Sequence, residues 1–371
     1  MSQTFQGRES RVDSQVGLPI SWYFDPEILE IERQHLFAVG PKYSGHTSLV
    51  PNDGDYFTLG GQQVGKLLVR HNGRPQLVSN TCRHRQAEMM CGSGHAKKIV
   101  CPMHNWAYDL DGRQVAAPHF DENPCLDLEK SELTEWNGLL YAGPRVIHHE
   151  AAPLASWTEL DTSNYVLERV DEEEHDLNWK NFLEVYLEDY HIGAVHPGFR
   201  VFVDAADVRN AFQAVGGDRF FCEQMNVRWP IPPAATPKFA EYQKVLLDVL
   251  AGHRPPFAAI WICLFPGQLV EYYPFTMVTT TYTPISPTST RLRSEYYFDR
   301  EIAETRRDYV EAGLAVLDEV TSEDHWAAVK LQAGRQTLWN RGENLQGPYQ
   351  MPMEQGLRRF HDCLRSIVQN A

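Results

Sequence analysis

The segment CRHRQAEMMCGSGHAKKIVCPMHNW (82–106) contains two short motifs, each with one cysteine and one histidine. The first motif pairs Cys82 with His84, and the second pairs Cys101 with His104. Thiolate and imidazole are common ligands of zinc and iron in proteins, so the segment predicts a metal site. The surrounding sequence has short apolar runs broken by turn residues, which predicts β-hairpins that hold the metal at their loops.

Two kinds of metal site fit four ligands of this type. A structural zinc site accepts two cysteines and two histidines in a tetrahedron. A Rieske [2Fe–2S] cluster uses the same set but places both histidines on one iron. Zinc fingers usually group cysteine with cysteine, whereas here each motif supplies one residue of each kind. The pairing favours the iron–sulfur cluster and leaves zinc as the alternative.

Composition describes an ordinary globular protein with small partners. The chain has 371 residues, of which 43% are hydrophobic and 22% charged, and its net charge is −15. Such an acidic chain predicts no nucleic-acid partner. We also expect no membrane contact, because no apolar run reaches the roughly 18 residues of a membrane span. The N-terminal residues lack the apolar core of a signal peptide.

The cysteine pattern favours a reducing compartment. Seven cysteines are spread along the chain, unlike the dense pattern of a disulfide scaffold. We therefore expect a cytoplasmic protein. The five cysteines outside the two motifs are expected to be small buried hydrophobic residues: Cys91, Cys125, Cys222, Cys263 and Cys363.

The order of the predicted elements indicates an α+β chain with a small β-rich domain inserted into a larger domain. We expect a helix over 25–36, hairpins between about 38 and 145, and a linker over 150–163. Further on, we expect helix over 171–193, two long strands over 273–298, helix over 299–320, and a further helical stretch with Ser322 as its N-cap. The predicted boundaries are 1–37 for an N-terminal part of the larger domain, 38–148 for the inserted domain and 149–371 for the rest.

A second cluster of candidate ligands lies in NWKNFLEVYLEDYHIGAVHPG (178–198), with Glu184, Glu188, Asp189, His191 and His196. A solvated acidic helix face with two incidental histidines is one interpretation. Glu188 and His191 would share a helix face, but two histidines five residues apart lie about 140° from each other around an ideal helix. Both can reach one ion only if the helix ends there, and the Pro that follows His196 favours such an end. Two histidines and one carboxylate form the typical site of non-haem Fe(II) oxygenases.

The whole chain resembles the Rieske non-haem iron oxygenases, of the aromatic ring-hydroxylating α-subunit type. CRHRQ and CPMHNWAYDLDGR resemble the cluster motifs, and the 178–198 segment resembles the iron motif. Glu323-Asp324 and the following Gln332-Ala333-Gly334 resemble the family's late iron-ligand helix. The resemblance implies a β-rich Rieske domain inserted in a helix-grip catalytic domain, an antiparallel sheet covered by helices.

The resemblance also assigns ligands. Cys82 and Cys101 would bind one iron of the cluster, and His84 and His104 the other. A mononuclear Fe(II) would be held by His191, His196 and Asp324, with Glu323 as the neighbour that could take the place of Asp324. Two positions depart from the family pattern, because Gln86 replaces a usual Gly and Met103 a frequent aromatic residue.

In the family, the carboxylate three residues before the first histidine ligand links that histidine to a cluster histidine of the adjacent subunit. Here it is Glu188, which implies a head-to-tail homotrimer. A glutamate at this position resembles the carnitine, choline and glycine-betaine monooxygenase branch. Val185 replaces a frequent Asn, which puts one supporting hydrogen bond in doubt.

The resemblance implies a terminal oxygenase that uses O2 and electrons from a flavin-containing NAD(P)H reductase, with or without a ferredoxin. Its small-molecule substrate would be a quaternary ammonium or N-methyl compound, hydroxylated or oxidatively dealkylated, and a small aromatic acid is the alternative. Aromatic residues of a pocket are expected in 257–273 and at Trp326, Trp339 and Tyr349. Two other classes stay open: an electron-transfer protein without oxygenase activity, and a zinc-stapled binding module.

Overall fold

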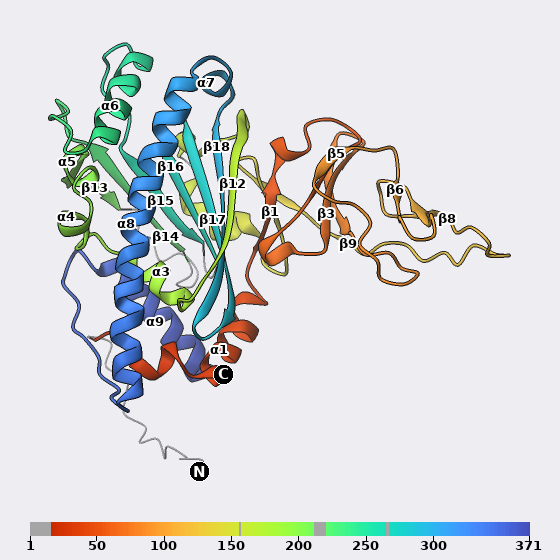
Figure 1. Cartoon of the computed structure of the whole chain (residues 1–371), viewed down its shortest axis with the longest axis horizontal. Coiled ribbons are helices and arrows are strands. Elements are labelled where there is room, and N and C mark those ends of the chain that lie inside the picture. Colours follow the sequence, from red (N-terminus) through yellow and green to blue (C-terminus); the bar gives the residue numbers. More distant parts are fainter. Residues whose placement is uncertain (1–15, 156, 211–219, 265–266) are drawn as a thin grey trace.

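Two β-rich units lie side by side in the protein (Figure 1). The structure is a computed structural model that describes residues 16–155, 157–210, 220–264 and 267–371. The smaller unit contains β1 to β11, and the larger unit is an antiparallel sheet with a long helix across it. The smaller unit follows the N-terminal helices and precedes the large sheet in the chain. The predicted α+β class with an inserted β-rich unit is therefore confirmed.

The smaller unit consists of three small sheets, with strand orders β5-β2-β3-β4-β9, β6-β7-β8 and β1-β11-β10. Its tightest hairpin joins β3 to β4 through Asn72 and Gly73, whose φ angles are 53° and 74°. Two left-handed residues match the twist of antiparallel strands, so this predicted hairpin is confirmed. The strands are β1 (Lys42–His46), β2 (Asp55–Thr58), β3 (Lys66–His71), β4 (Arg74–Ser79), β5 (Ser93–His95), β6 (Ile99–Val100), β7 (Ala107–Tyr108), β8 (Gln114–Ala116), β9 (Lys130–Ser131), β10 (Thr134–Trp136) and β11 (Leu139–Ala142).

The larger unit is built on a seven-stranded antiparallel sheet of order β12-β18-β17-β16-β15-β14-β13. Its longest strands include the two that the sequence predicted around the Pro-Ser turn. The strands are β12 (Tyr165–His175), β13 (Val203–Asn210), β14 (Phe220–Val227), β15 (Ala259–Leu264), β16 (Gln268–Tyr273), β17 (Thr276–Ser286) and β18 (Ser289–Asp299).

The prediction of helix over 171–193 is wrong for its first part. The acidic residues 171–174 belong to β12, and they pair with β18. Glu172 lies opposite Arg293, and their side chains form an ion pair at 2.8 Å. Cross-strand pairs of opposite charge stabilise a strand in which local charge alone suggested a solvated helix face. The helix begins only at Trp179, where the side chain of Asn178 accepts a hydrogen bond from the N–H of Lys180.

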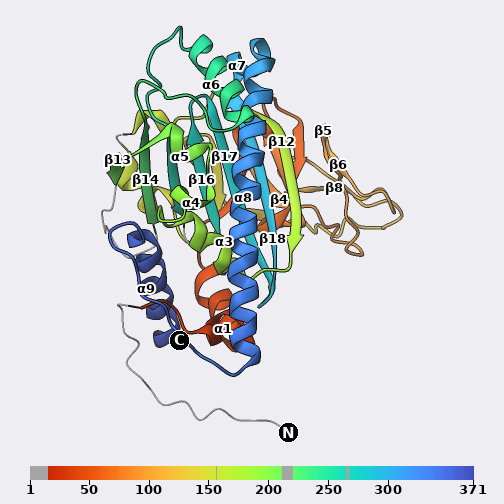
Figure 2. The same ribbon diagram turned by 60° about the vertical axis from the view of Figure 1, so that its left-hand side comes forward.

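The long helix α8 (Arg307–Asn340) crosses the face of the sheet (Figures 1 and 2). Ser322 lies in its interior and donates a hydrogen bond to the carbonyl of Asp318 at 2.6 Å, so the predicted N-cap is wrong. The other helices are α1 (Pro26–Glu32), α2 (Ile147–Glu150), α3 (Trp179–Tyr186), α4 (Ile192–Val195), α5 (Phe199–Phe202), α6 (Pro237–Val249), α7 (Arg300–Thr305) and α9 (Gln355–Asn370). Single turns or short helical segments are η1 (Ile20–Tyr23), η2 (Arg33–Phe37), η3 (Thr47–Leu49), η4 (Gly61–Gln63), η5 (Ala152–Leu154) and η6 (Thr158–Leu160).

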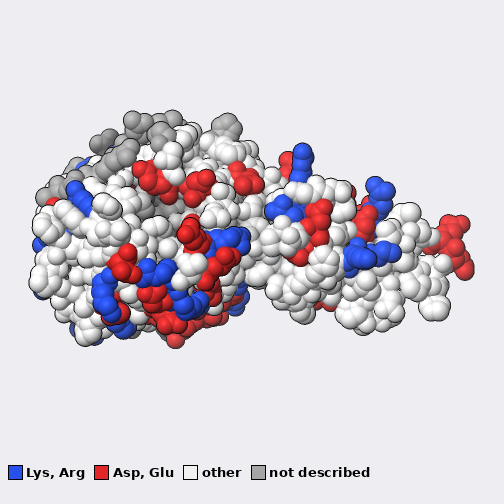
Figure 3. Space-filling model, turned by 90° about the horizontal axis from the view of Figure 1, so that it is seen from above, with Lys and Arg blue, Asp and Glu red and all other residues white. Residues whose placement is uncertain are grey.

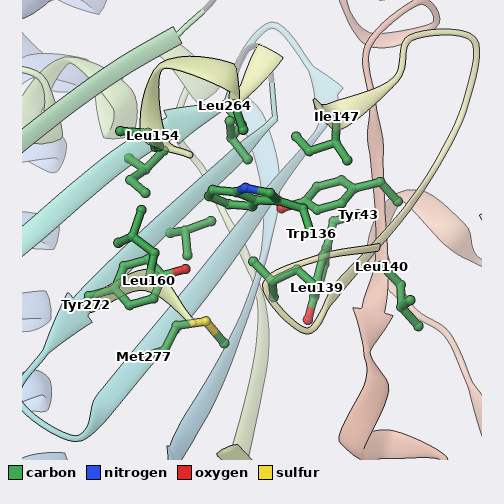
Figure 4. Packing of buried hydrophobic residues seen from close by; sticks show 14 of the residues in the cluster. Tyr43, Trp136, Leu139, Leu140, Ile147, Leu154, Leu160, Leu264, Tyr272 and Met277 are labelled. Carbon is green, nitrogen blue, oxygen red and sulfur yellow. The ribbon is translucent and has the colours of Figure 1, made fainter. Parts of the chain in front are cut away.

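Two faces of the large sheet have different neighbours. One face packs against the smaller unit through a buried cluster around Trp136, to which Tyr43, Leu160, Tyr272 and Met277 contribute (Figure 4). The opposite face carries the helices. The segment expected to be a linker forms short helices that belong to the first cluster. These contacts leave the helix-covered face as the place for a buried site.

The N-terminal helix α1 packs against α3 and α9 of the larger unit in a second cluster that includes Leu29, Leu183 and Phe360. The predicted helix over 25–36 is confirmed, because α1 and η2 together cover it. The described part of the chain therefore begins in the larger unit and returns to it after β11.

The surface of the larger unit carries both acidic and basic side chains. Acidic and basic side chains alternate on the face of the larger unit seen from above (Figure 3). In the described part of the chain, no helix combines the length and the hydropathy needed to cross a bilayer.

None of the seven cysteines, which all lie in the described residues, forms a disulfide, and five of them are buried. Cys91 and Cys125 are exposed, so the expectation that they are buried hydrophobic residues is wrong for these two. Both lie outside the strands of the smaller unit, where the backbone turns at the surface and no core surrounds the side chain.

Candidate metal centres and active site

The loop 82–87 is closed by two backbone hydrogen bonds. The N–H of Cys82 donates to the carbonyl of Ala87 at 2.9 Å, and the N–H of Gln86 donates to the carbonyl of Cys82 at 3.0 Å. Gln86 has a φ of 56°, in the left-handed region where glycine is favoured. The family's usual Gly at this position is thus explained by the backbone, and Gln86 adopts the same conformation with a side chain.

The loop 101–106 repeats this geometry. The N–H of Cys101 donates to the carbonyl of Trp106 at 2.8 Å, and the N–H of Asn105 donates to the carbonyl of Cys101 at 3.0 Å. Asn105 has a φ of 58° and is the counterpart of Gln86. Two loops of one shape therefore present their Cys-His pairs from neighbouring hairpins.

The four side chains of these loops separate into an inner and an outer pair. Cys82 and Cys101 are buried, whereas His104 is exposed. The rings of His84 and His104 lie 4.7 Å apart between centroids, and the ring of His84 stacks on Trp106 at 5.0 Å. This arrangement suits a cluster whose cysteine-bound iron is enclosed and whose histidine-bound iron faces outward.

The spacing of these ligands argues against a single zinc ion. Tetrahedral zinc needs its ligand atoms about 2.0–2.3 Å from the metal, and so within about 4 Å of one another. Across the described residues, His191, His196 and Asp324 form the one group of at least three possible ligands whose atoms all lie within 4.8 Å. The Cys-His loops do not meet this limit, whereas a two-iron cluster spans the larger gap. The loops therefore fit the [2Fe–2S] group and not zinc.

The second candidate centre is the convergence of His191, His196 and Asp324. The Nε2 atoms of the two histidines lie 3.1 Å apart. Oδ1 of Asp324 lies 2.9 Å from Nε2 of His196 and 3.5 Å from Nε2 of His191. Three atoms of the types that bind Fe(II) thus converge on one point.

The local chain path explains how histidines five residues apart converge. The helix α3 ends at Tyr186, and His191 and His196 flank the single turn α4. Asp324 comes from the middle of α8, which packs against this region. The predicted end of the helix at this point is confirmed.

Each histidine is held from behind by a glutamate. Oε1 of Glu188 lies 2.6 Å from Nδ1 of His191, and Oε2 of Glu323 lies 2.7 Å from Nδ1 of His196. Carboxylates in this position orient an imidazole so that Nε2 faces the metal. The carboxylate of Asp324 therefore lies between the two imidazoles, whereas that of Glu323 lies behind one of them.

The side chains of this group have protonation properties that suit the binding of a cation. Burial raises the pKa of Asp324, but hydrogen bonds from His191 and His196 outweigh it and leave the pKa below its usual value. Burial lowers the pKa of His191, but hydrogen bonds to Asp324 and Glu188 outweigh it and raise the pKa to about 9. A divalent cation would replace the protons between these groups.

A cavity opens beside this centre on the helix-covered face of the sheet. Its wall is mostly aromatic and aliphatic, with a few acidic side chains. Besides the centre itself, the wall includes Tyr186, Asp189, Phe199, Phe202, Phe239, Tyr242, Trp261, Glu271, Tyr273, Val316, Leu317 and Thr321. Such a wall, with few polar groups, is typical of a small-molecule site.

Three of the predicted pocket residues lie elsewhere. Trp326 is 57% exposed on α8, Trp339 stacks on Phe24, and the hydroxyl of Tyr349 lies 2.7 Å from Nδ1 of His361. Trp326 and Trp339 point away from the cavity because α8 presents only one face to the sheet. The predicted stretch 257–273 does contribute, through Trp261, Glu271 and Tyr273.

Glu271 is a buried carboxylate at the wall of this cavity. It is 6% exposed, and Oε2 accepts a hydrogen bond from the hydroxyl of Tyr273 at 2.6 Å. Burial raises the pKa of Glu271 to about 7, although the bond from Tyr273 lowers it. Glu271 also borders a second cavity of about 470 Å³, whose wall includes Asp171 and Asp318. An acidic group of this kind needs a cation or a proton.

Two metal-type centres and an adjoining apolar cavity define a metal-dependent oxidoreductase with separate electron-carrying and catalytic sites. Residues 42–132 match the Rieske [2Fe-2S] domain, and residues 154–370 match the ring hydroxylating alpha subunit (catalytic domain). The chain belongs to this family of Rieske non-haem iron oxygenases. It is therefore an oxygenase with a Rieske [2Fe–2S] cluster and a mononuclear iron, which rules out the zinc-stapled module and the electron carrier without oxygenase activity.

The chain is similar over nearly its full length to proteins of known activity. It is 40% identical to a putrescine 2-hydroxylase of Ralstonia nicotianae, with 96% of this chain and 97% of the relative covered. It is 38% identical to a putrescine 2-hydroxylase of Bordetella bronchiseptica, with 96% and 86% covered. Among solved structures, a quaternary ammonium Rieske monooxygenase in complex with an inhibitor has a TM-score of 0.75 at 19% identity, with 96% of both chains covered.

Proposed function

We propose that this chain is the terminal oxygenase of a system that hydroxylates a carbon of a small aliphatic diamine, with putrescine as the first candidate. The full-length similarity to two putrescine 2-hydroxylases supports this substrate class. The observation in the structure that carries it is Glu271, a buried carboxylate beside the metal-ligand group and in an otherwise mostly apolar wall. An ammonium group is a natural partner for such a carboxylate.

A quaternary ammonium compound is the second candidate. The expectation from the sequence named this class, and the rings of Tyr186, Trp261 and Tyr273 at the cavity wall are suited to cation–π contact with a trimethylammonium group. A small aromatic acid fits less well, because its carboxylate would meet Glu271 and Asp189 in the same cavity. Both favoured candidates are cations, and they differ in whether the nitrogen can donate hydrogen bonds.

The proposed ligands follow the geometry of the two centres. His191, His196 and Asp324 would hold Fe(II), while Glu188 and Glu323 orient the two imidazoles. Cys82, Cys101, His84 and His104 would hold the [2Fe–2S] cluster. When bound, the iron supplies O2 activation at open coordination positions, and the cluster supplies electrons. The apolar wall formed by side chains such as Phe199 and Leu317 keeps bulk water from the substrate carbon.

Electron delivery is proposed to cross between subunits of a head-to-tail homotrimer. Within one chain, the loops with the cluster ligands lie in the smaller unit, far along the molecule from α4 (Figure 1). His104 is exposed in the loop between β6 and β7, and Glu188 is hydrogen-bonded to His191 near the surface residue Tyr190, which is 58% exposed. His104 of one subunit would contact Glu188 of the next. A flavin-containing NAD(P)H reductase, with or without a ferredoxin, would supply the electrons.

The proposed domain boundaries remain 1–37, 38–148 and 149–371. The packing of α1 against α3 and α9 supports an N-terminal part of the catalytic domain. The matched ranges 42–132 and 154–370 fall inside the second and third boundaries.

The proposed activity is tested by turnover with NADH, a surrogate reductase and 18O2. The substrates would be putrescine, carnitine, choline and a small aromatic acid, with products identified by mass. We expect one labelled hydroxyl on a carbon of putrescine. Labelled product only from carnitine or choline would replace the diamine by the second candidate, and label only in a ring would contradict both.

A further inference from the structure

Three side chains stand in one row across three neighbouring strands of the large sheet. In the register of β14, β15 and β16, Glu223 lies opposite Trp261, and Trp261 lies opposite Glu271. Directly paired residues of adjacent strands point to the same side of a sheet. Trp261 and Glu271 line the cavity beside the metal-ligand group, so Glu223 points to the same side. The sheet thus carries two carboxylates with an indole between them.

Both carboxylates are buried without a basic partner. Glu223 is 5% exposed and Glu271 is 6% exposed. Within the described residues, no Lys or Arg forms an ion pair with either of them, although such pairs are frequent elsewhere on this sheet, as between Arg293 and Glu172. A buried carboxylate without a cation is costly, because its charge has lost its hydration. The free energy that this costs is recovered if a cationic ligand enters the cavity.

The end of the row at Glu223 reaches the cavity through Asp189. The two carboxyl groups are hydrogen-bonded to each other, and Asp189 lines the cavity wall. Oε1 of Glu223 is buried and has no hydrogen-bond partner. This end of the row therefore offers a free acceptor to a cation that enters the cavity.

The distance between the two ends fits a short diamine. Directly opposed residues of antiparallel strands lie about 4.5–5.5 Å apart, so the backbones at Glu223 and Glu271 are about 10 Å apart. An extended four-carbon diamine spans about 6 Å between its nitrogens. Two charge-assisted hydrogen bonds of about 2.8 Å add nearly as much again. The two lengths are of the same order, and the face of an indole is well suited to lie against the methylene chain between the ends.

We infer that the cavity is a receptor for both ends of a linear diammonium ion: Glu271 with Tyr273 binds one ammonium, and Asp189 backed by Glu223 binds the other. This inference rests on the proposed function and adds the residues that select the length of the substrate. Holding both ends places an interior methylene, rather than a nitrogen, beside His191, His196 and Asp324. The receptor thus explains hydroxylation on carbon and predicts discrimination against monoamines.

The unaltered enzyme tests the receptor with a series of substrates. These are 1,3-diaminopropane, putrescine, cadaverine and n-butylamine, each measured for KM, for kcat and for equilibrium binding by calorimetry. We expect putrescine to have the lowest KM, and n-butylamine to bind about tenfold or more weakly, because it lacks the second charged hydrogen bond. If putrescine is hydroxylated but n-butylamine binds equally well, the receptor is wrong and the proposed function stands. If no diamine is hydroxylated while a quaternary ammonium compound is, the proposed function itself fails.

Two variants distinguish the contributions that the two ends of the receptor make to substrate binding. Glu223→Gln should raise the KM for putrescine about tenfold or more and leave that for n-butylamine unchanged, whereas Glu271→Gln should raise both. Glu135→Gln, an exposed change of the same type on β10, is the matched control and should alter neither. The visible spectrum of the cluster and thermal unfolding verify that each variant is folded. If Glu223→Gln raises the KM for both amines equally, Glu223 does not recognise the second ammonium.

Discussion

Oε1 of Glu188 lies 2.6 Å from Nδ1 of His191, and Oε2 of the same carboxylate accepts a hydrogen bond from the backbone N–H of His191 at 3.0 Å. The carboxylate thus holds both the ring and the backbone of one proposed iron ligand. It is the innermost part of the proposed route for electrons from a neighbouring subunit.

Replacing Glu188 by Gln should slow electron delivery without releasing the iron. The amide retains the shape of the side chain but cannot carry the charge that links two imidazoles. We expect kcat to fall by about ten- to a hundredfold, the usual effect of losing a partner of a metal-bound histidine. The measurement is the rate at which a prereduced cluster is oxidised when O2 and substrate are added, together with the iron content.

Glu323 provides the matched comparison, because it holds His196 in the same way but on the other side of the centre. Glu323→Gln should weaken iron binding and leave cluster oxidation normal in protein that is reloaded with iron. Equal effects of the two substitutions on cluster oxidation would contradict a special role of Glu188 in electron delivery.

Replacing Asp324 by Ala should remove the mononuclear iron and leave the cluster. Two histidines without the carboxylate bind Fe(II) weakly, whereas the cluster ligands lie in the smaller unit. The check is iron analysis beside the visible spectrum, in which the cluster absorption stays and product formation is lost. Normal iron content in this variant would mean that a different carboxylate completes the site.

Replacing Gln86 by Gly should stabilise the cluster loop. Gln86 has a φ of 56°, which costs a residue with a side chain about 1–2 kcal/mol relative to Gly. Part of that gain is offset by the greater freedom of Gly in the unfolded chain, so we expect about 0.5–1 kcal/mol. Asn105→Gly in the matching loop should gain less, because Asn tolerates this conformation well. The rate of cluster loss on heating measures the effect of each substitution. A faster loss in Gln86→Gly than in the wild type would contradict the expected stabilisation.

The binding of an amine substrate should improve as the pH rises through about 7. The pKa of Glu271 is raised to about 7, so below this pH its carboxyl group is increasingly protonated and attracts an ammonium group less. We expect kcat/KM to fall up to tenfold per pH unit below 7 while the amine itself stays charged. Glu271→Gln should abolish this dependence, and an unchanged pH profile would assign it to another group.

The raised pKa of Glu271 makes the stability of the protein depend on pH in the opposite direction to substrate binding. Because the folded protein keeps the proton of Glu271 to a higher pH than the unfolded chain does, folding is favoured at low pH by this group. That contribution is lost as the pH rises from about 4.5 to about 7. Denaturant unfolding across this pH range measures the free energies of unfolding of the wild type and of Glu271→Gln. The difference between the two free energies should become smaller toward low pH.

Glu184, which the sequence placed among the candidate ligands, belongs to a buried ionic network instead. It accepts hydrogen bonds from Tyr23 at 2.5 Å and Arg335 at 2.5 Å, and lies 3.0 Å from Nε2 of His361. Glu184→Gln should destabilise the protein by about 3–5 kcal/mol, because Arg335 would be left buried without its counter-charge. Denaturant unfolding measures this, and a loss below 1 kcal/mol would contradict it.

This network also predicts acid sensitivity. Burial raises the pKa of Glu184, but Arg335 and His361 outweigh it and lower the pKa to about 2. The stability contributed by Glu184 is therefore present above its usual pKa and is lost as the pH falls toward 2. The Gln variant should lack this part of the acid transition.

The shape of the two Cys-His loops and the convergence of the two histidines, which we propose as ligands, follow from short stretches of sequence because their geometry is local. Cys82 and His84 lie in one tight loop whose shape depends on backbone hydrogen bonds within six residues. His191 and His196 flank one turn, which the following proline helped to predict. Residues so close in the chain are brought together whatever the rest of the fold does.

Burial, register and long-range pairing were decided only by the tertiary structure. The acidic run 171–174 became part of a strand because Arg291 and Arg293 of β18 lie opposite it, and Trp326 became a surface residue through the rotation of α8. Glu223 and Glu271 are 48 positions apart in the sequence and share the row with Trp261 only through the register of three strands. A shift of one residue in either pairing would turn one carboxylate to the other face of the sheet. The sequence alone thus determined which side chains are available as the proposed metal ligands, and the register of the sheet decided which carboxylates share the face of the cavity.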